Sequence, residues 1–174
     1  KLEYYKGFDK FVNSILNFDE LFPNIIQATV IGTGSIYDKY REIISIKKKN
    51  NLFIFHQRIS HEEIYNFHQN THLYVSLNQY GNLSNANLEA IACNDCIVMP
   101  EPEYDTSVDV YTKKLLGDAV MYVSRTNTVK NLCKIYQYLI ENQDQISKYN
   151  EKTYKLHDKF MTWEKRIEEE IKLI

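Results

Sequence analysis

The sequence has little cysteine, no large excess of one charge and no long apolar run. Three cysteines in 174 residues do not make a disulfide framework, and the odd number fits a reducing cytoplasm. The formal net charge is −2, so no overall basic field exists to hold a nucleic acid. No apolar segment approaches the roughly 20 residues needed to span a bilayer. The first residues lack a signal-peptide pattern, and because the chain does not begin with Met we expect a piece of a longer protein.

The apolar residues that are present suffice for one domain. They make up 44% of the chain, and their spacing changes repeatedly between the periods of helices and strands. A helix is expected from Phe8 to Ile15, followed after Pro23 by a strand over 25–32. Further strands are expected at 52–55, 71–77, 96–99 and 119–124. Further helices are expected after 32–35, over 60–69, over 84–93 and near 111. Residues 129–174 are expected to form an amphipathic helix followed by two more helical stretches.

Single helices between the strands predict a doubly wound, Rossmann-like α/β fold. Strands that lack two-residue hairpin turns need crossover connections, which gives a parallel sheet covered on both faces. Ligands of such sheets bind outside the carboxyl ends of the strands. The loops that follow the expected strands are 32–35, 56–60, 78–85 and 100–105.

Several site motifs can be set aside. The stretch GTGSIY lacks the third glycine of a dinucleotide fingerprint, since Tyr37 stands there, and no acidic residue occurs over 52–57 to receive a ribose. The chain has no G-x-x-x-x-G-K-[ST] loop, no G-x-S-x-G elbow and no H-E-x-x-H. Cys93 ends a helical run and Cys96 opens a strand, which disfavours a redox pair, and a zinc site would need a second pair of ligands.

The stretch GNLSNANLEA, residues 81–90, has more polar groups than a turn needs. Glycine and small residues before a helix expose backbone N–H groups, which form an anion site without side-chain charge. The carboxylate of Glu89 lies beside apolar neighbours on the expected helix, where two sugar hydroxyls would supply hydrogen-bond donors. Alternatively, Glu89 faces water and interacts with the helix dipole. The residue pattern leaves both interpretations open.

The chain resembles the C-terminal, donor-binding domain of a family 4 (group 1) glycosyltransferase of the GT-B fold. The resemblance rests on KLEYYKGFD, VIGTGS, NLFIFHQRISHEEI, LEAIACNDCIVM and TWEKRIEEEI, and covers nearly all of residues 1–174 as a single nucleotide-sugar-binding domain. It implies contacts with the donor for Lys1, Lys6, Gln57, Arg58, Ile59, Gly81, Asn82, Leu83, Ser84, Asn85 and Glu89.

The resemblance also implies a role for each group of residues. Lys1 and Lys6 would hold the donor diphosphate, with a lysine in place of the usual arginine at the first position. Residues 57–59 would receive the base, the backbone of 82–85 the distal phosphate and sugar, and Glu89 the ribose. The family has a pair of glutamates with seven residues between them. Glu89 matches the second glutamate, but Gly81 stands at the position of the first, so Asn82 and Asn85 would hydrogen-bond the sugar instead.

The implied reaction is retaining transfer of a sugar from a nucleotide-diphospho-sugar to an acceptor hydroxyl, in cell-surface glycan or polysaccharide synthesis. No metal or other cofactor is expected, and the chain lacks Asp-x-Asp. An N-terminal acceptor domain is expected outside this chain. The resemblance implies a cytoplasmic enzyme and allows peripheral association with the inner face of the membrane. Because Gly81 replaces a carboxylate, the alternative is a non-catalytic glycosyltransferase-like module that binds a sugar nucleotide or a partner protein.

Overall fold

Strands and helices alternate along the chain, as the apolar periodicity predicts. The computed structural model describes residues 1–79, 83–102, 110–160, 168 and 171–172. The strands are β1 (Ala28–Ile31), β2 (Phe53–His56), β3 (Tyr74–Val75), β4 (Ile97–Pro100) and β5 (Met121–Val123). The α-helices are α1 (Phe8–Leu21), α2 (Tyr37–Ile46), α3 (His61–Gln69), α4 (Asn85–Ala92), α5 (Val110–Leu116), α6 (Thr128–Glu141) and α7 (Asp144–Tyr154). Short 3₁₀ helices are η1 (Tyr4–Lys6), η2 (Asn50–Leu52) and η3 (His157–Lys159).

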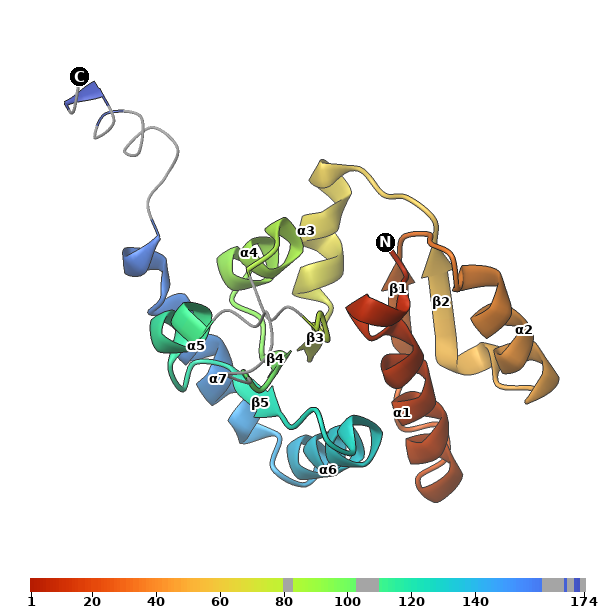
Figure 1. Cartoon of the computed structure of the whole chain (residues 1–174). Coiled ribbons are helices and arrows are strands. Elements are labelled where there is room, and N and C mark those ends of the chain that lie inside the picture. Colours follow the sequence, from red (N-terminus) through yellow and green to blue (C-terminus); the bar gives the residue numbers. More distant parts are fainter. Residues whose placement is uncertain (80–82, 103–109, 161–167, 169–170, 173–174) are drawn as a thin grey trace.

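All strand pairs are parallel, which confirms the predicted α/β class. The strands form two sheets rather than the single expected sheet: β1 pairs with β2, and β4 lies between β3 and β5. Figure 1 shows the two sheets beside each other, with α1 and α2 next to β1 and β2. The expected strand over 71–77 is shortened to β3, because only its middle pairs with β4 and its last residue, Leu77, packs against the start of α1 instead.

The core lies on both faces of β4. Val98 belongs to one cluster of buried side chains, whereas Ile97 and Met99 belong to another, as the alternation of side chains along a strand requires. The Val98 cluster includes residues of both sheets and of α1 and α6. Every residue of β4 is buried. Coverage on both faces is typical of parallel sheets.

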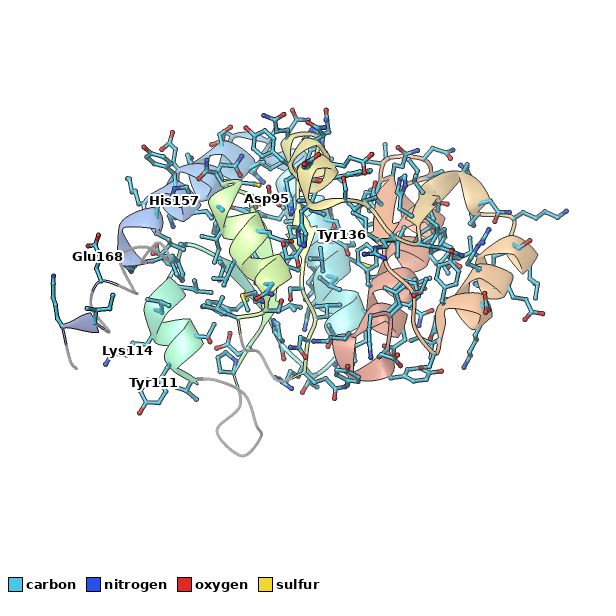
Figure 2. The ribbon with its side chains drawn as sticks, turned by 90° about the horizontal axis from the view of Figure 1, so that it is seen from above. Asp95, Tyr111, Lys114, Tyr136, His157 and Glu168 are labelled. Atoms are coloured by element: carbon cyan, nitrogen blue, oxygen red, sulfur yellow. The ribbon has the colours of Figure 1, made fainter. Side chains whose placement is uncertain are left out.

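Helices α1 and α6 join the two halves of the molecule. The hydroxyls of Ser14 and Tyr136 lie 2.9 Å apart in the interior, and the rings of Phe18 and Tyr136 pack edge to face at 5.7 Å. Figure 2 shows Tyr136 between these two helices. Burial raises the pKa of the Tyr136 phenol, so this hydroxyl stays neutral at physiological pH.

Two predicted helix starts are confirmed in detail. Ser60 accepts a hydrogen bond from the backbone N–H of Glu63, whose side chain in turn binds the Ser60 backbone N–H, as in a capping box. Ser84 accepts one from the backbone N–H of Asn87 at the start of α4. In the part of the chain that is described, no helix is long and apolar enough to cross a membrane.

Candidate functional site

The first residues of the chain cross the glycine loop that follows β1. The Leu2 N–H donates to the Thr33 carbonyl at 3.0 Å. A Cβ atom on Gly34 would lie 2.2 Å from the Leu2 carbonyl oxygen, closer than any side chain tolerates. Glycine at position 34 therefore allows the loop to lie against the backbone of the chain's own first residues.

Glu3 binds one backbone N–H and one hydroxyl of the same loop. Its Oε1 accepts from the backbone N–H of Ser35 at 3.1 Å, and its Oε2 accepts from the Ser35 hydroxyl. These hydrogen bonds, that of the hydroxyl first, lower the pKa of Glu3. The start of α2 already holds a carboxylate of the chain, so an external anion would have to displace it.

Lys6 is the last residue of η1 and lies near the carboxyl end of β3. The Lys6 Nζ lies 5.4 Å from the centre of the Tyr5 ring. The Tyr5 carbonyl accepts from the Gln79 N–H at 2.8 Å. A Cβ atom on Gly7 would lie 2.4 Å from the Cβ of Leu77, so glycine permits the close approach here. Lys1, by contrast, is exposed at the start of the segment.

Glu89 lies on α4, partly buried, with 32% of its side chain exposed. Its Oε1 lies 3.6 Å from Nδ1 of His61, the first residue of α3. This distance is beyond a hydrogen bond, and among the described residues no hydrogen bond to the Glu89 carboxylate is formed. Burial, with the nearby charges of Glu89 and Asp95, raises the pKa of the Tyr74 phenol on β3. Within the described residues Glu89 is therefore a partly desolvated acceptor whose one close charged neighbour is His61.

The remaining predicted donor residues lie on two neighbouring segments. Gln57 and Arg58 are exposed after β2, and Ile59 is half-buried before the Ser60 cap. Leu83 packs against the second core cluster, and Asn85 is exposed at the first turn of α4. The other two predicted positions, Gly81 and Asn82, lie outside the described residues.

The described contacts bring these residues together in two groups. Tyr5 connects Lys6 to the segment after β3, and His61 connects Glu89 to the segment after β2. Among the described residues, no hydrogen bond or ion pair joins Lys1 or Lys6 directly to Glu89. Sequence reasoning missed Glu3, His61 and Arg125. Arg125 follows β5, and applying the rule for strand ends to the last strand would have identified its loop.

The Cys93 and Cys96 thiols lack the properties of a redox pair. Cys93 caps the end of α4, and Cys96 is 1% exposed just before β4. Burial raises the pKa of Cys93, and it raises the pKa of Cys96 to about 12. Thiol exchange needs thiolate, which a helix N-terminus or a nearby cation would favour. The interpretation of these cysteines as structural is therefore supported.

Two shallow hollows that described residues form lie away from the predicted donor site. One, of about 540 Å³, lies between the end of α4 and α7 and includes Cys93, Asn94 and Tyr154. The other, of about 450 Å³, lies between α1 and α6 and includes Leu21 and Val129. Neither is lined by a predicted donor residue.

The sequence profile of the family described as "Glycosyl transferases group 1" matches residues 1–156. A search of curated proteins gives no significant match.

Three solved structures show the fold. Sucrose-phosphate synthase from Thermosynechococcus elongatus is 14% identical with a TM-score of 0.76, over 99% of this chain and 42% of that one. The pneumococcal O-GlcNAc transferase GtfA, in complex with UDP and GlcNAc, is 16% identical with a TM-score of 0.72, over 97% of this chain and 34% of that one. The C-terminal domain of the group 1 glycosyl transferase LpcC from Francisella tularensis is 17% identical with a TM-score of 0.71, over 88% and 78%.

At these identities the structures establish the fold alone, and this chain spans less than half of the first two proteins. The family profile covers most of the chain, and the fold agrees with it, so the resemblance predicted from sequence is confirmed. The chain belongs to the group 1 glycosyl transferase family, and its fold is that of the C-terminal domain of such a protein.

Proposed function

We propose that this chain is the donor-binding domain of a retaining glycosyltransferase. It binds a nucleotide-diphospho-sugar, whose sugar passes to an acceptor hydroxyl in the synthesis of a cell-surface glycan or polysaccharide. The observation that carries this proposal is the carboxylate of Glu89, which is partly buried beside the start of α3 and accepts no hydrogen bond from the described residues. GtfA, whose structure holds UDP and GlcNAc, has the same fold and supports a nucleotide sugar as the ligand.

Glu89 accepts hydrogen bonds from the ribose hydroxyls. Each hydrogen bond to a charged acceptor contributes about 1.5 to 3 kcal/mol, more than the dipole interaction of a solvated glutamate. Its position beside His61 sets the ribose next to the segment after β2, where Gln57, Arg58 and Ile59 receive the base.

Lys1 and Lys6 hold the diphosphate. Glu3 already binds the backbone at the start of α2. The phosphate therefore binds at the start of α4, the helix that Ser84 caps. In the transfer step, the lysine ammonium groups and the N–H groups before α4 stabilise the leaving diphosphate without a metal. Gly81 and Asn82 precede α4 in the sequence, and Asn82 and Asn85 bind the transferred sugar.

The acceptor is bound by a second, N-terminal domain. This chain spans 34% of GtfA and 42% of sucrose-phosphate synthase, which leaves ample length for such a domain in a protein of that size. The three cysteines are free thiols, which fits a cytoplasmic enzyme.

Calorimetric titration of the chain with UDP, GDP and ADP tests the proposal. We expect one of these nucleotides to bind and expect Glu89→Gln and Lys6→Ala each to weaken its binding by about tenfold or more, the size of one charge-assisted hydrogen bond. Glu151→Gln and Lys114→Ala, exposed on α7 and α5, are the matched controls and should leave the affinity unchanged. If no nucleotide binds the wild-type chain, the proposal is wrong.

A transfer assay then separates catalysis from binding alone. Gly81, in place of a family carboxylate, favours the second candidate, a module that binds sugar nucleotides without chemistry. The assay needs the chain together with its acceptor domain. Nucleotide binding without transfer or hydrolysis of any nucleotide sugar would support the module.

A further inference from the structure

Arg125 lies where the ends of three strands meet. It is the second residue after β5. Its Nε donates to the carbonyl of Glu101, the first residue after β4, at 3.1 Å. One terminal nitrogen of the same guanidinium donates to the carbonyl of Gln79, in the segment after β3. One side chain therefore connects the carboxyl ends of β3, β4 and β5.

The backbone of Gln79 is not bound by a neighbouring strand, because the pairing of β3 with β4 ends before it. The last backbone hydrogen bond between β3 and β4 runs from the Ser76 N–H to the Val98 carbonyl. Beyond this point the segment is held by other groups: the Gln79 N–H donates to the Tyr5 carbonyl, and its carbonyl accepts from Arg125. Both backbone groups of Gln79 are thus bound, on one side to η1 and on the other to the loop after β5.

We propose that Arg125 is a positioning residue of the donor site. By fixing Gln79, it fixes the Tyr5 carbonyl and with it Lys6, the next residue of η1, at the carboxyl end of β3. Arg125 itself need not touch the nucleotide. The inference rests on the proposed function only in giving Lys6 a diphosphate to bind.

Binding the carbonyls of Glu101 and Gln79 at the same time requires an arginine rather than any cation. A guanidinium presents several N–H donors in a rigid, planar fork and so binds two carbonyls at once, whereas a lysine ammonium is a point charge on a flexible stem. Lys113, from α5, pairs with the carboxylate of Glu101 in the same region, at a site where both side chains are about two-fifths exposed. It provides a control cation that does not contact Gln79.

Amide hydrogen exchange followed by NMR tests the positioning directly, without a nucleotide. In Arg125→Gln and Arg125→Lys, the Gln79 amide should exchange at least about tenfold faster than in the wild type, because opening its hydrogen bond becomes easier. The amide of Cys93, bonded inside the α4 cap, should keep its rate, and so should Gln79 in Lys113→Gln. An unchanged Gln79 rate in Arg125→Gln, or an equal increase at both amides, would overturn the proposal.

A double-mutant cycle with the nucleotide that the wild type binds tests the functional part. Arg125→Gln should weaken binding by about tenfold on its own, but far less in the Lys6→Ala background, since coupled residues give non-additive effects. In the Glu89→Gln background, the fold-losses in nucleotide affinity caused by the two substitutions should multiply, as for independent residues. Multiplicative losses with Lys6→Ala would mean that Arg125 does not act through Lys6. If the wild type binds none of UDP, GDP and ADP while exchange at Gln79 still responds, the proposed function fails and the positioning of Gln79 stands.

Discussion

Glu3 binds Ser35 through both oxygens of its carboxylate, one to the backbone N–H and one to the side-chain hydroxyl. The two residues are separated by 32 positions in the chain. Their contact fixes the first residues across the end of β1, next to η1 and Lys6.

The Glu3 contact predicts a pH-dependent attachment of the first residues. Because the pKa of Glu3 is lowered in the folded chain, the contact stabilises the fold above the pKa of the unfolded chain. This stabilisation is lost as the pH falls through the lowered folded pKa. A ¹³C NMR titration of the Glu3 carboxyl should show its pKa below the ordinary value. Ser35→Ala removes the hydroxyl, the largest cause, and should raise the pKa of Glu3 toward its ordinary value, so an unaltered titration in that variant would contradict the contact.

Gly34→Ala should destabilise the chain, because the new methyl group would meet the Leu2 backbone rather than a flexible side chain. Overpacking of this kind costs about 1 to 3 kcal/mol. Gly117→Ala is the matched control: it has a φ of 57°, but nothing lies within 4 Å of its added Cβ. It should cost about 1 kcal/mol from backbone conformation alone. Urea unfolding measures the loss of stability in both variants. Only Gly34→Ala should also weaken nucleotide binding, because it displaces Lys1 and Lys6.

His68 and Asp95 form a buried pair, with Nδ1 of the ring 2.7 Å from Oδ2 of the carboxylate. His68→Leu would leave the carboxylate, 3% exposed, without its partner. Removing one member of a buried pair costs about 3 to 5 kcal/mol, which urea unfolding should detect. Lys148→Ala breaks the exposed pair with Asp144 and should have no detectable effect. If both substitutions lower the free energy of unfolding by equally small amounts, the buried pair does not stabilise the fold.

The thiols of Cys93 and Cys96 should react slowly with a disulfide reagent in the native chain at pH 8. Both pKa values are raised by burial, that of Cys96 to about 12, so little thiolate is present. The same reagent should modify all three cysteines rapidly after denaturation. Rapid native modification of Cys96 would contradict the structural interpretation of this residue.

Local features were predictable because their cause is local. The Ser60–Glu63 capping box and the Ser84 cap depend on side chains three residues from the N–H groups that they bind. The α/β class followed from the same kind of periodicity. The position of Cys93 at a helix end and of Cys96 before a strand could be predicted for the same reason.

Tertiary features were not predictable in this way. Nothing in the GTGS loop indicates that Leu2 and Glu3 will lie against it, because the contact joins segments about 32 residues apart. The link from Arg125 to Gln79 spans 46 residues. The length of β3 depends on where its partner β4 ends its pairing, so an apolar run of seven residues indicated a strand without setting its extent.

The two sheets are joined mainly by side-chain packing. Within the described ranges, a single backbone hydrogen bond, from Gln79 to Tyr5, crosses between the halves, while α1 and α6 pack along the rest of the joint. Apolar contacts have no preferred direction, whereas a strand ladder has a fixed register. The shapes of the packed side chains, together with the Ser14–Tyr136 contact, therefore determine how the two halves meet. Lys6 and Glu89 lie in different halves, so a ligand that bound both would add a further connection across this joint.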